Sequence, residues 1–172
     1  EALSTLIKRL AVDHLHIVGD VFDRGEHPDD ILDLLMEHHS IDIQWGNHDI
    51  LWMGATAGSD ACIATTIRNN IQYNNMQMLE NGYGISLRTL TLFAERLYPD
   101  MEPMKAALKA ISVILFKLEG QIISRHPEYN MDDRRLLHKI NYENGTIEIE
   151  GKTYEMNDVN FPTVDRENPY EL

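Results

Sequence analysis

Two short apolar runs, each ending at a glycine, constrain the fold of this chain most strongly. Residues 14–18 end at Gly19, and residues 41–45 end at Gly46. Residues 28–38, which lie between them, begin with a proline and two acids and then repeat apolar side chains at helical spacing. The order strand, helix, strand predicts a parallel pair whose two following loops lie at the same edge of the sheet.

Both predicted loops carry side chains that suit metal-assisted hydrolysis of phosphate esters. Residues 19–25 read GDVFDRG, and residues 46–49 read GNHD. Carboxylate and amide oxygens suit hard divalent ions such as Mn²⁺ or Mg²⁺. The planar fork of an arginine matches phosphate oxygens, and a histidine can donate a proton to a leaving alkoxide. Ligands of open α/β sheets bind at this edge, so the pattern predicts a phosphoesterase site there.

A plainer interpretation is that both loops are only tight turns and helix caps. Gly-Asp pairs and Asn-His-Asp turns do occur in that role. This would explain the glycines and Asp49, but it leaves an arginine and a histidine at the same sheet edge without a reason. The catalytic interpretation is therefore favoured.

Composition excludes several other classes of protein. The formal net charge is −13, from 15 basic and 28 acidic residues, which argues against a nucleic-acid or anionic-membrane partner. Cys62 is the sole cysteine, so no internal disulfide is expected and a reducing cytoplasm is the natural compartment. The sequence contains no apolar run long enough for a membrane span. It starts inside an amphipathic pattern, and we interpret both ends as cuts in a longer protein.

The ordered pair GDxxDRG and GNHD resembles the motifs of the calcineurin-like metallophosphoesterases, which include the Ser/Thr protein phosphatases. The resemblance implies that Asp20 bridges two metal ions and that Asn47 binds the second ion. It also implies an αββα sandwich, of which this chain would form a part. The fold class expected is therefore α/β, with a largely helical insertion and a β-hairpin.

The same resemblance implies roles for the remaining polar side chains of the two loops. His48 would be the general acid for the leaving oxygen, oriented by Asp23, and Arg24 would hold the phosphate. Asp49 is expected in a supporting role. These three catalytic assignments and the two metal assignments follow from position in the motifs.

Further blocks of sequence resemble the class III fructose-1,6-bisphosphatases of bacteria and cover nearly the whole chain. This resemblance implies hydrolysis of the 1-phosphate of fructose 1,6-bisphosphate, a gluconeogenic reaction, with manganese as the usual metal. The blocks that carry it are residues 38–54, 57–64, 80–85, 116–123 and 125–134.

The chain divides at about residue 54 by the character of its sequence. Residues 1–54 are expected to be part of the catalytic core, and residues 55–172 to be a mainly helical insertion that ends in a hairpin. Helices are predicted at the start of the chain and in three later segments, and Asn144-Gly145 favours a type I′ hairpin turn. Besides the helix over residues 28–38, the predicted helices are residues 1–11, 55–80, 87–98 and 103–119, and the hairpin strands are residues 139–143 and 146–150.

The resemblance also indicates what this chain lacks. The superfamily has an Asp-x-His loop before the first motif and two later histidine-bearing loops, and none of these is found here. His126 is the only late histidine considered as a ligand, and a surface role is favoured for it. We therefore expect the chain alone to bind metal weakly and to have little activity. Arg68 and Tyr73 are candidates to reach a sugar phosphate.

Two alternatives to the bisphosphatase remain open. A protein or dinucleotide phosphatase could use the same metal-binding loops, and residues 55–172 could serve assembly or regulation instead of catalysis. A homo-oligomer is left open, and no residue identifies an effector site.

Overall fold

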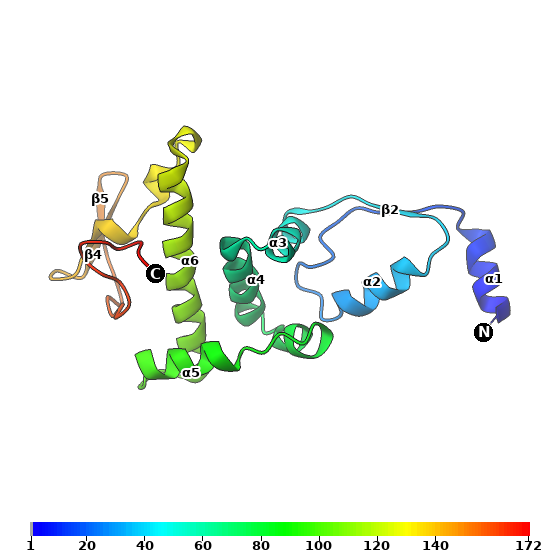
Figure 1. Cartoon of the computed structure of the whole chain (residues 1–172), viewed down its shortest axis with the longest axis horizontal. Helices are drawn as coiled ribbons and strands as arrows, with labels where there is room; N and C mark the ends of the chain where they lie inside the picture. The colour runs from blue at the N-terminus through cyan, green and yellow to red at the C-terminus, as the bar shows by residue number, and fades with distance from the viewer. Residues whose placement is uncertain (1) are drawn as a thin grey trace. The chain divides into compact units, whose positions relative to one another are not determined.

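The computed structural model describes residues 2–172 as a mixed α/β protein with two compact units, one ending at Leu87 and the other formed by Arg88–Leu172 (Figure 1). The first unit contains the predicted strand–helix–strand segment. Its elements are α1 (Ala2–Ala11), β1 (Leu15–Ile17), α2 (Pro28–Met36), β2 (Ile41–Ile43), α3 (Asn47–Thr56), α4 (Asp60–Gln72) and the π-helical turn η1 (Met78–Gly82).

Strands β1 and β2 form a two-stranded parallel sheet, which confirms the predicted pairing. Leu15 lies opposite Ile41, and Ile17 lies opposite Ile43. Helix α2 connects the two strands and starts with Pro28 in its first turn, as expected. The apolar residues of β1 are only half-buried, and Ile43 of β2 is 44% exposed. A parallel sheet is normally buried because other elements cover both of its faces. The sheet of β1 and β2 has only two strands, and its residues are not covered to that extent.

Helices α3 and α4 pack against each other directly after the second loop. Ser59 begins α4, and its hydroxyl accepts a hydrogen bond from the backbone of Cys62. The continuous helix predicted for residues 55–80 is broken twice, because Gly58 and Asn74 take positive φ angles. The predicted division near residue 54 lies inside α3, whereas the compact units meet between Leu87 and Arg88.

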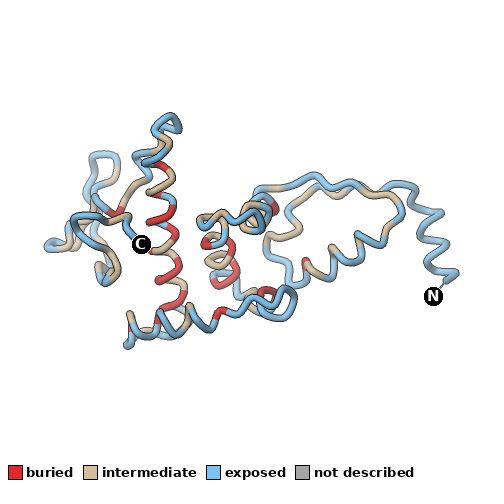
Figure 2. The backbone as a smooth tube through the Cα atoms, viewed as in Figure 1, coloured by how far each residue is buried: buried red, intermediate tan, exposed pale blue. Residues whose placement is uncertain are grey.

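The second unit is organised around one long helix. Helices α5 (Arg88–Leu97) and α6 (Pro103–Arg125) pack together, and Figure 2 shows buried residues along much of α6. The Glu102 carboxylate caps α6 by accepting hydrogen bonds from the first turn of its backbone. The helix extends six residues beyond the predicted end at 119. Three 3₁₀ turns follow it, η2 (Pro127–Tyr129), η3 (Asp132–Arg134) and η4 (Leu137–Lys139).

A three-stranded antiparallel sheet follows these turns, in the order β3 (Ile140–Asn141), β4 (Thr146–Ile149) and β5 (Lys152–Glu155). The predicted hairpin is confirmed as the β3–β4 pair, but its turn type was wrong. Asn141 pairs with Thr146, so four residues connect the strands and only Gly145 has a positive φ. The two-residue turn with both φ angles positive lies instead at Glu150–Gly151, between β4 and β5.

Among residues 2–172, no helix combines the length and the apolar character needed to cross a membrane.

Candidate active site in the first unit

The two motif loops pack directly against each other. Gly19 has a φ of +96°, and a Cβ there would lie 2.6 Å from both the Gln44 carbonyl oxygen and the Gly46 nitrogen. Asp20 follows with a φ of +54°, a conformation that non-glycine residues adopt rarely. A Cβ on Gly46 would overlap the Asp20 carboxylate. Both glycines are therefore required for the close approach of the loops, and the backbone at Asp20 is strained as it is at many functional sites.

Asp49 ties the two loops together. Its carboxylate accepts hydrogen bonds from the backbone N–H groups of Asp20 at 2.6 Å, Gly46 at 2.8 Å and Phe22 at 3.2 Å. The side chain is buried and lies in the first turn of α3, where the helix dipole also favours a negative charge. Because its oxygens are already occupied by three donors, Asp49 acts as a structural anchor of the site.

The carboxylate of one predicted metal ligand, Asp20, lies against the first turn of α3, which begins at the other, Asn47. The Asp20 carboxylate accepts a hydrogen bond from the His48 backbone N–H at 3.1 Å, which places it next to Asn47 in the preceding position. Both residues are exposed. An exposed carboxylate beside an exposed amide fits the donor chemistry of Mn²⁺ or Mg²⁺. The described part of the chain holds no cluster of three or more His, Cys, Asp or Glu side chains suited to an ion.

The predicted catalytic side chains meet at one carboxylate oxygen. Asp23 Oδ1 lies 3.1 Å from His48 Nε2 and 3.4 Å from Arg24 Nε. This oxygen is hidden from solvent, and its contacts are ion-pair distances without hydrogen-bond geometry. The His48 side chain is 21% exposed, whereas Arg24 is 65% exposed. A partly enclosed histidine and an open arginine on one carboxylate can act on the same bound phosphate ester.

The remaining candidates are distributed more widely. The Arg24 guanidinium carbon lies 4.8 Å above the centre of the Tyr73 ring, which places Tyr73 beside the first motif loop. Arg68 lies within α4. His126 belongs to the second unit, where Nδ1 lies 2.7 Å from Glu128 Oε1 and the ring stacks on Tyr129. These contacts supply His126 with local partners, and a ligand role for it has no support in its surroundings.

An apolar hollow of about 1050 Å³ lies beside the motif loops. Phe22 stacks on Trp52 with ring centroids 4.5 Å apart, and Tyr83 packs on Trp52 at 5.1 Å. Trp45 also lines the hollow and is 59% exposed. Both tryptophans therefore form part of the wall of this hollow.

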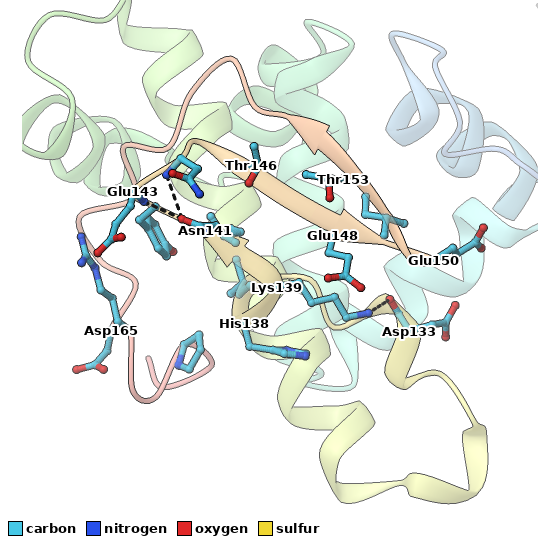
Figure 3. Close-up of a pocket in the computed structure, with 18 residues that line it drawn as sticks. Asp133, His138, Lys139, Asn141, Glu143, Thr146, Glu148, Glu150, Thr153 and Asp165 are labelled. Carbon is cyan, nitrogen blue, oxygen red and sulfur yellow. Dashed lines mark hydrogen bonds between the residues drawn. The ribbon is translucent and has the colours of Figure 1, made fainter.

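The second unit has a hollow of its own against β3, β4 and β5, also of about 1050 Å³ (Figure 3). Acidic side chains from several elements line it, and Lys139 donates a hydrogen bond to the Asp133 carbonyl at its edge. None of the predicted catalytic or metal-binding residues contributes to this hollow. The acidic residues that line it are Asp133, Glu143, Glu148, Glu150 and Asp165.

Comparison with known proteins decides the family. Residues 1–172 match the family model described as Firmicute fructose-1,6-bisphosphatase. The chain belongs to the Firmicute fructose-1,6-bisphosphatase family. It is 54% identical over 192 residues to a class 3 fructose-1,6-bisphosphatase of Clostridium beijerinckii, 50% over 190 residues to one of Alkaliphilus metalliredigens and 51% over 191 residues to one of Listeria monocytogenes.

These bisphosphatases are much longer than the chain. Each match covers 99% of this chain but 29% of the relative, so the chain spans under a third of the curated proteins it matches. No solved structure gave a significant match. Membership of the fructose-1,6-bisphosphatase family therefore rests on sequence.

Sequence reasoning missed two residues of this site. Phe22 contributes a backbone donor to Asp49 and a ring to the wall of the hollow. Asn75 donates from its side-chain amide to the carbonyl oxygens of Arg24 and Gly25. The asparagine-rich stretch after α4 was the only signal for Asn75, because side-chain bonds to a distant loop leave no periodic pattern.

Proposed function

We propose that the protein carrying this chain hydrolyses fructose 1,6-bisphosphate to fructose 6-phosphate and phosphate, as a manganese-dependent metallophosphoesterase of the cytoplasm in gluconeogenesis. The chain would supply part of a calcineurin-like αββα sandwich with its helical insertion. The proposal is supported by the family and by the printed names of the relatives, which are fructose-1,6-bisphosphatases. A homo-oligomer remains compatible with it.

The observation that carries the chemistry is the shared carboxylate oxygen of Asp23. It pairs with His48 Nε2 at 3.1 Å and with Arg24 Nε at 3.4 Å. One anionic group therefore holds a proton donor and a phosphate-binding cation close together. A structural turn would not require this combination at the edge where Asp20 and Asn47 are exposed.

The chain's own residues divide the reaction between them. The open guanidinium of Arg24 binds phosphate oxygens and stabilises the charge that they carry in the transition state. His48 donates a proton to the departing sugar oxygen, and Asp23 orients its imidazole and stabilises the charged form. Asp49 keeps both loops in register through its three backbone hydrogen bonds. Asp20 and Asn47 would hold the metal ions.

The metal ions, when bound, would activate a water molecule and neutralise phosphate charge, which matters for a chain of net charge −13. In the full-length protein, Asp20→Asn should therefore weaken manganese binding. The chain alone is predicted to bind manganese weakly, and titration calorimetry on it measures this directly. Two tightly bound ions would contradict the expectation that further ligand-bearing loops are needed.

A substrate panel tests the proposed function. Full-length wild-type protein with manganese is given fructose 1,6-bisphosphate, a phosphoserine peptide or a dinucleoside polyphosphate at equal concentration, and phosphate release is followed. We expect the bisphosphate to have the highest kcat/KM and fructose 6-phosphate to accumulate without further hydrolysis. Preference for the peptide or the dinucleotide would assign the same site to another phosphatase class. Absence of release from all three would support an assembly role.

A further inference from the structure

The phosphate-binding arginine is contacted by residues from a segment far along the chain. Asn75 Nδ2 donates hydrogen bonds to the carbonyl oxygens of Arg24 at 3.1 Å and of Gly25 at 3.3 Å. The ring of Tyr73 lies under the guanidinium, 4.8 Å from its central carbon. The backbone and the side chain of Arg24 are thus each held by a different residue of the same short segment.

This segment is fixed to the end of helix α4. The Tyr73 backbone N–H donates to the Asn69 carbonyl at 2.9 Å, and the Asn75 N–H donates to the Asn70 carbonyl at 2.8 Å. Asn74, between them, has a φ of +60° and reverses the chain in the manner of a helix C-cap. Asn70 is itself buried. Tyr73 and Asn75 are therefore rigid extensions of α4 and not parts of a free loop.

The side chain of Arg24 remains available to a ligand despite these contacts. It is 65% exposed, and its Nε lies 3.4 Å from Asp23 Oδ1. Within residues 2–172, the guanidinium forms no side-chain hydrogen bond. An aromatic face stabilises a guanidinium without using its donors, because the attraction acts through the ring's π face. The contact with the Tyr73 ring therefore leaves the hydrogen-bond donors of Arg24 available to phosphate oxygens.

We infer that Tyr73 and Asn75 are positioning residues that orient Arg24 for phosphate binding, and that helix α4 thereby contributes to the active site. This inference rests on the proposed function for the role of Arg24. It gives two residues near the start of the 55–172 region, which the sequence alone predicted to be an insertion, a role in the active site.

Binding of inorganic phosphate to the manganese-loaded full-length protein, followed by ³¹P NMR, tests the inference without any turnover. Tyr73→Leu should raise the phosphate Kd roughly two- to fivefold, the range of an exposed cation–π contact. Tyr73→Phe keeps the ring and should bind as wild type does. Asn75→Asp keeps the shape but loses both donors, and should raise the Kd roughly two- to tenfold. Tyr154→Leu and Asn144→Asp, in the second unit, are matched controls with no expected effect.

The double variants separate positioning from general loss of structure. In an Arg24→Ala background, Tyr73→Leu and Asn75→Asp should have no further effect on the phosphate Kd, because they act through Arg24. Equal effects with and without Arg24 would overturn the inference, as would wild-type Kd values for both single variants. Phosphate binding that behaves as expected in a protein inactive on fructose 1,6-bisphosphate would overturn only the proposed substrate. A wild-type protein that binds no phosphate would overturn the role of Arg24 and the inference with it.

Discussion

His48 Nε2 lies 3.1 Å from Asp23 Oδ1, although the two residues belong to loops that follow different strands. The parallel pairing of β1 and β2 places both loops at one edge, and Asp49 holds them together. The histidine therefore has a carboxylate beside its Nε2 in the absence of any ligand. Several measurable consequences follow from this arrangement and from the packing around it.

Asp23→Asn should lower kcat of the full-length enzyme at least about tenfold, because the amide no longer stabilises protonated His48. The asparagine keeps the size of the side chain, so the fold should be retained. Asp30→Asn is a matched control, since Asp30 forms an exposed pair with His27 at 3.6 Å in the same unit. Steady-state kinetics on fructose 1,6-bisphosphate measure the effect, and an Asp23→Asn enzyme with wild-type kcat would contradict the orienting role.

Asp49→Ala should destabilise the motif loops by about 3 kcal/mol or more, because three backbone donors lose a charged acceptor in a buried position. Hydrogen exchange monitored by mass spectrometry should show faster exchange in peptides that contain Asp20, Phe22 and Gly46. Asp60→Ala removes another acid from the first turn of a helix, but Asp60 is exposed, and its peptide should exchange nearly as in wild type. Unchanged protection after Asp49→Ala would show that other contacts hold the loops.

The Lys109–Asp158 ion pair should make the second unit sensitive to acid. The hydrogen bond from Lys109, and then that from the Asn160 N–H, lower the pKa of Asp158 below its ordinary value of 3.8. A carboxyl with a lower pKa in the folded protein contributes stability above the unfolded pKa and loses it as the pH falls through the folded pKa.

Thermal unfolding from about pH 5 down to about pH 2 measures this contribution, because the range spans the ordinary aspartate pKa of about 4. Asp158→Asn should lower the melting temperature at the upper end of the range and have a smaller effect at the lower end. The exposed Asp100→Asn variant is the control and should follow wild type. An Asp158→Asn effect that does not shrink with acid would mean that the pair contributes no pH-dependent stability.

Lys117 should anchor the C-terminal segment to α6. The buried Nζ donates to the carbonyl oxygens of Thr163 and Glu171, the latter at 2.6 Å. Lys117→Met keeps most of the apolar stem but leaves both carbonyls without this donor, so the second unit should lose about 1–3 kcal/mol. Lys152→Met on exposed β5 is the matched control. Chemical denaturation of the full-length protein measures both, and equal stability of the two variants would contradict the anchor.

The sequence predicted those parts of the fold that depend on local pattern. The spacing of apolar residues and Pro28 at a helix start led to the strand–helix–strand unit, which the pairing of Leu15 with Ile41 confirms. The end of α4 was not predicted because its left-handed residue is Asn74. In a sequence, such a conformation is normally signalled by a glycine. The β4–β5 turn was missed for a similar reason, since Glu150 takes a positive φ beside Gly151.

In the candidate site, too, the features set by local motifs were predicted and those set by tertiary contacts were missed. Motif position alone brought His48, Asp23 and Arg24 into one hypothesis, and the structure places the three together, while their catalytic roles stay predictions. The contacts of Tyr73 and Asn75 with Arg24 could not be predicted, because they depend on where α4 ends in space relative to the first loop. Such tertiary contacts have no periodic signature in a single sequence.

The most direct test of the account compares two leaving groups in the full-length protein. His48→Ala should lower kcat/KM for fructose 1,6-bisphosphate by about 10²–10⁴-fold, because the sugar alkoxide needs a proton as it departs. With 2,4-dinitrophenyl phosphate, whose phenolate leaves without protonation, the same variant should retain nearly wild-type kcat/KM. An equal loss on both substrates would contradict the assignment of His48 as the general acid, and with it the central claim about this site.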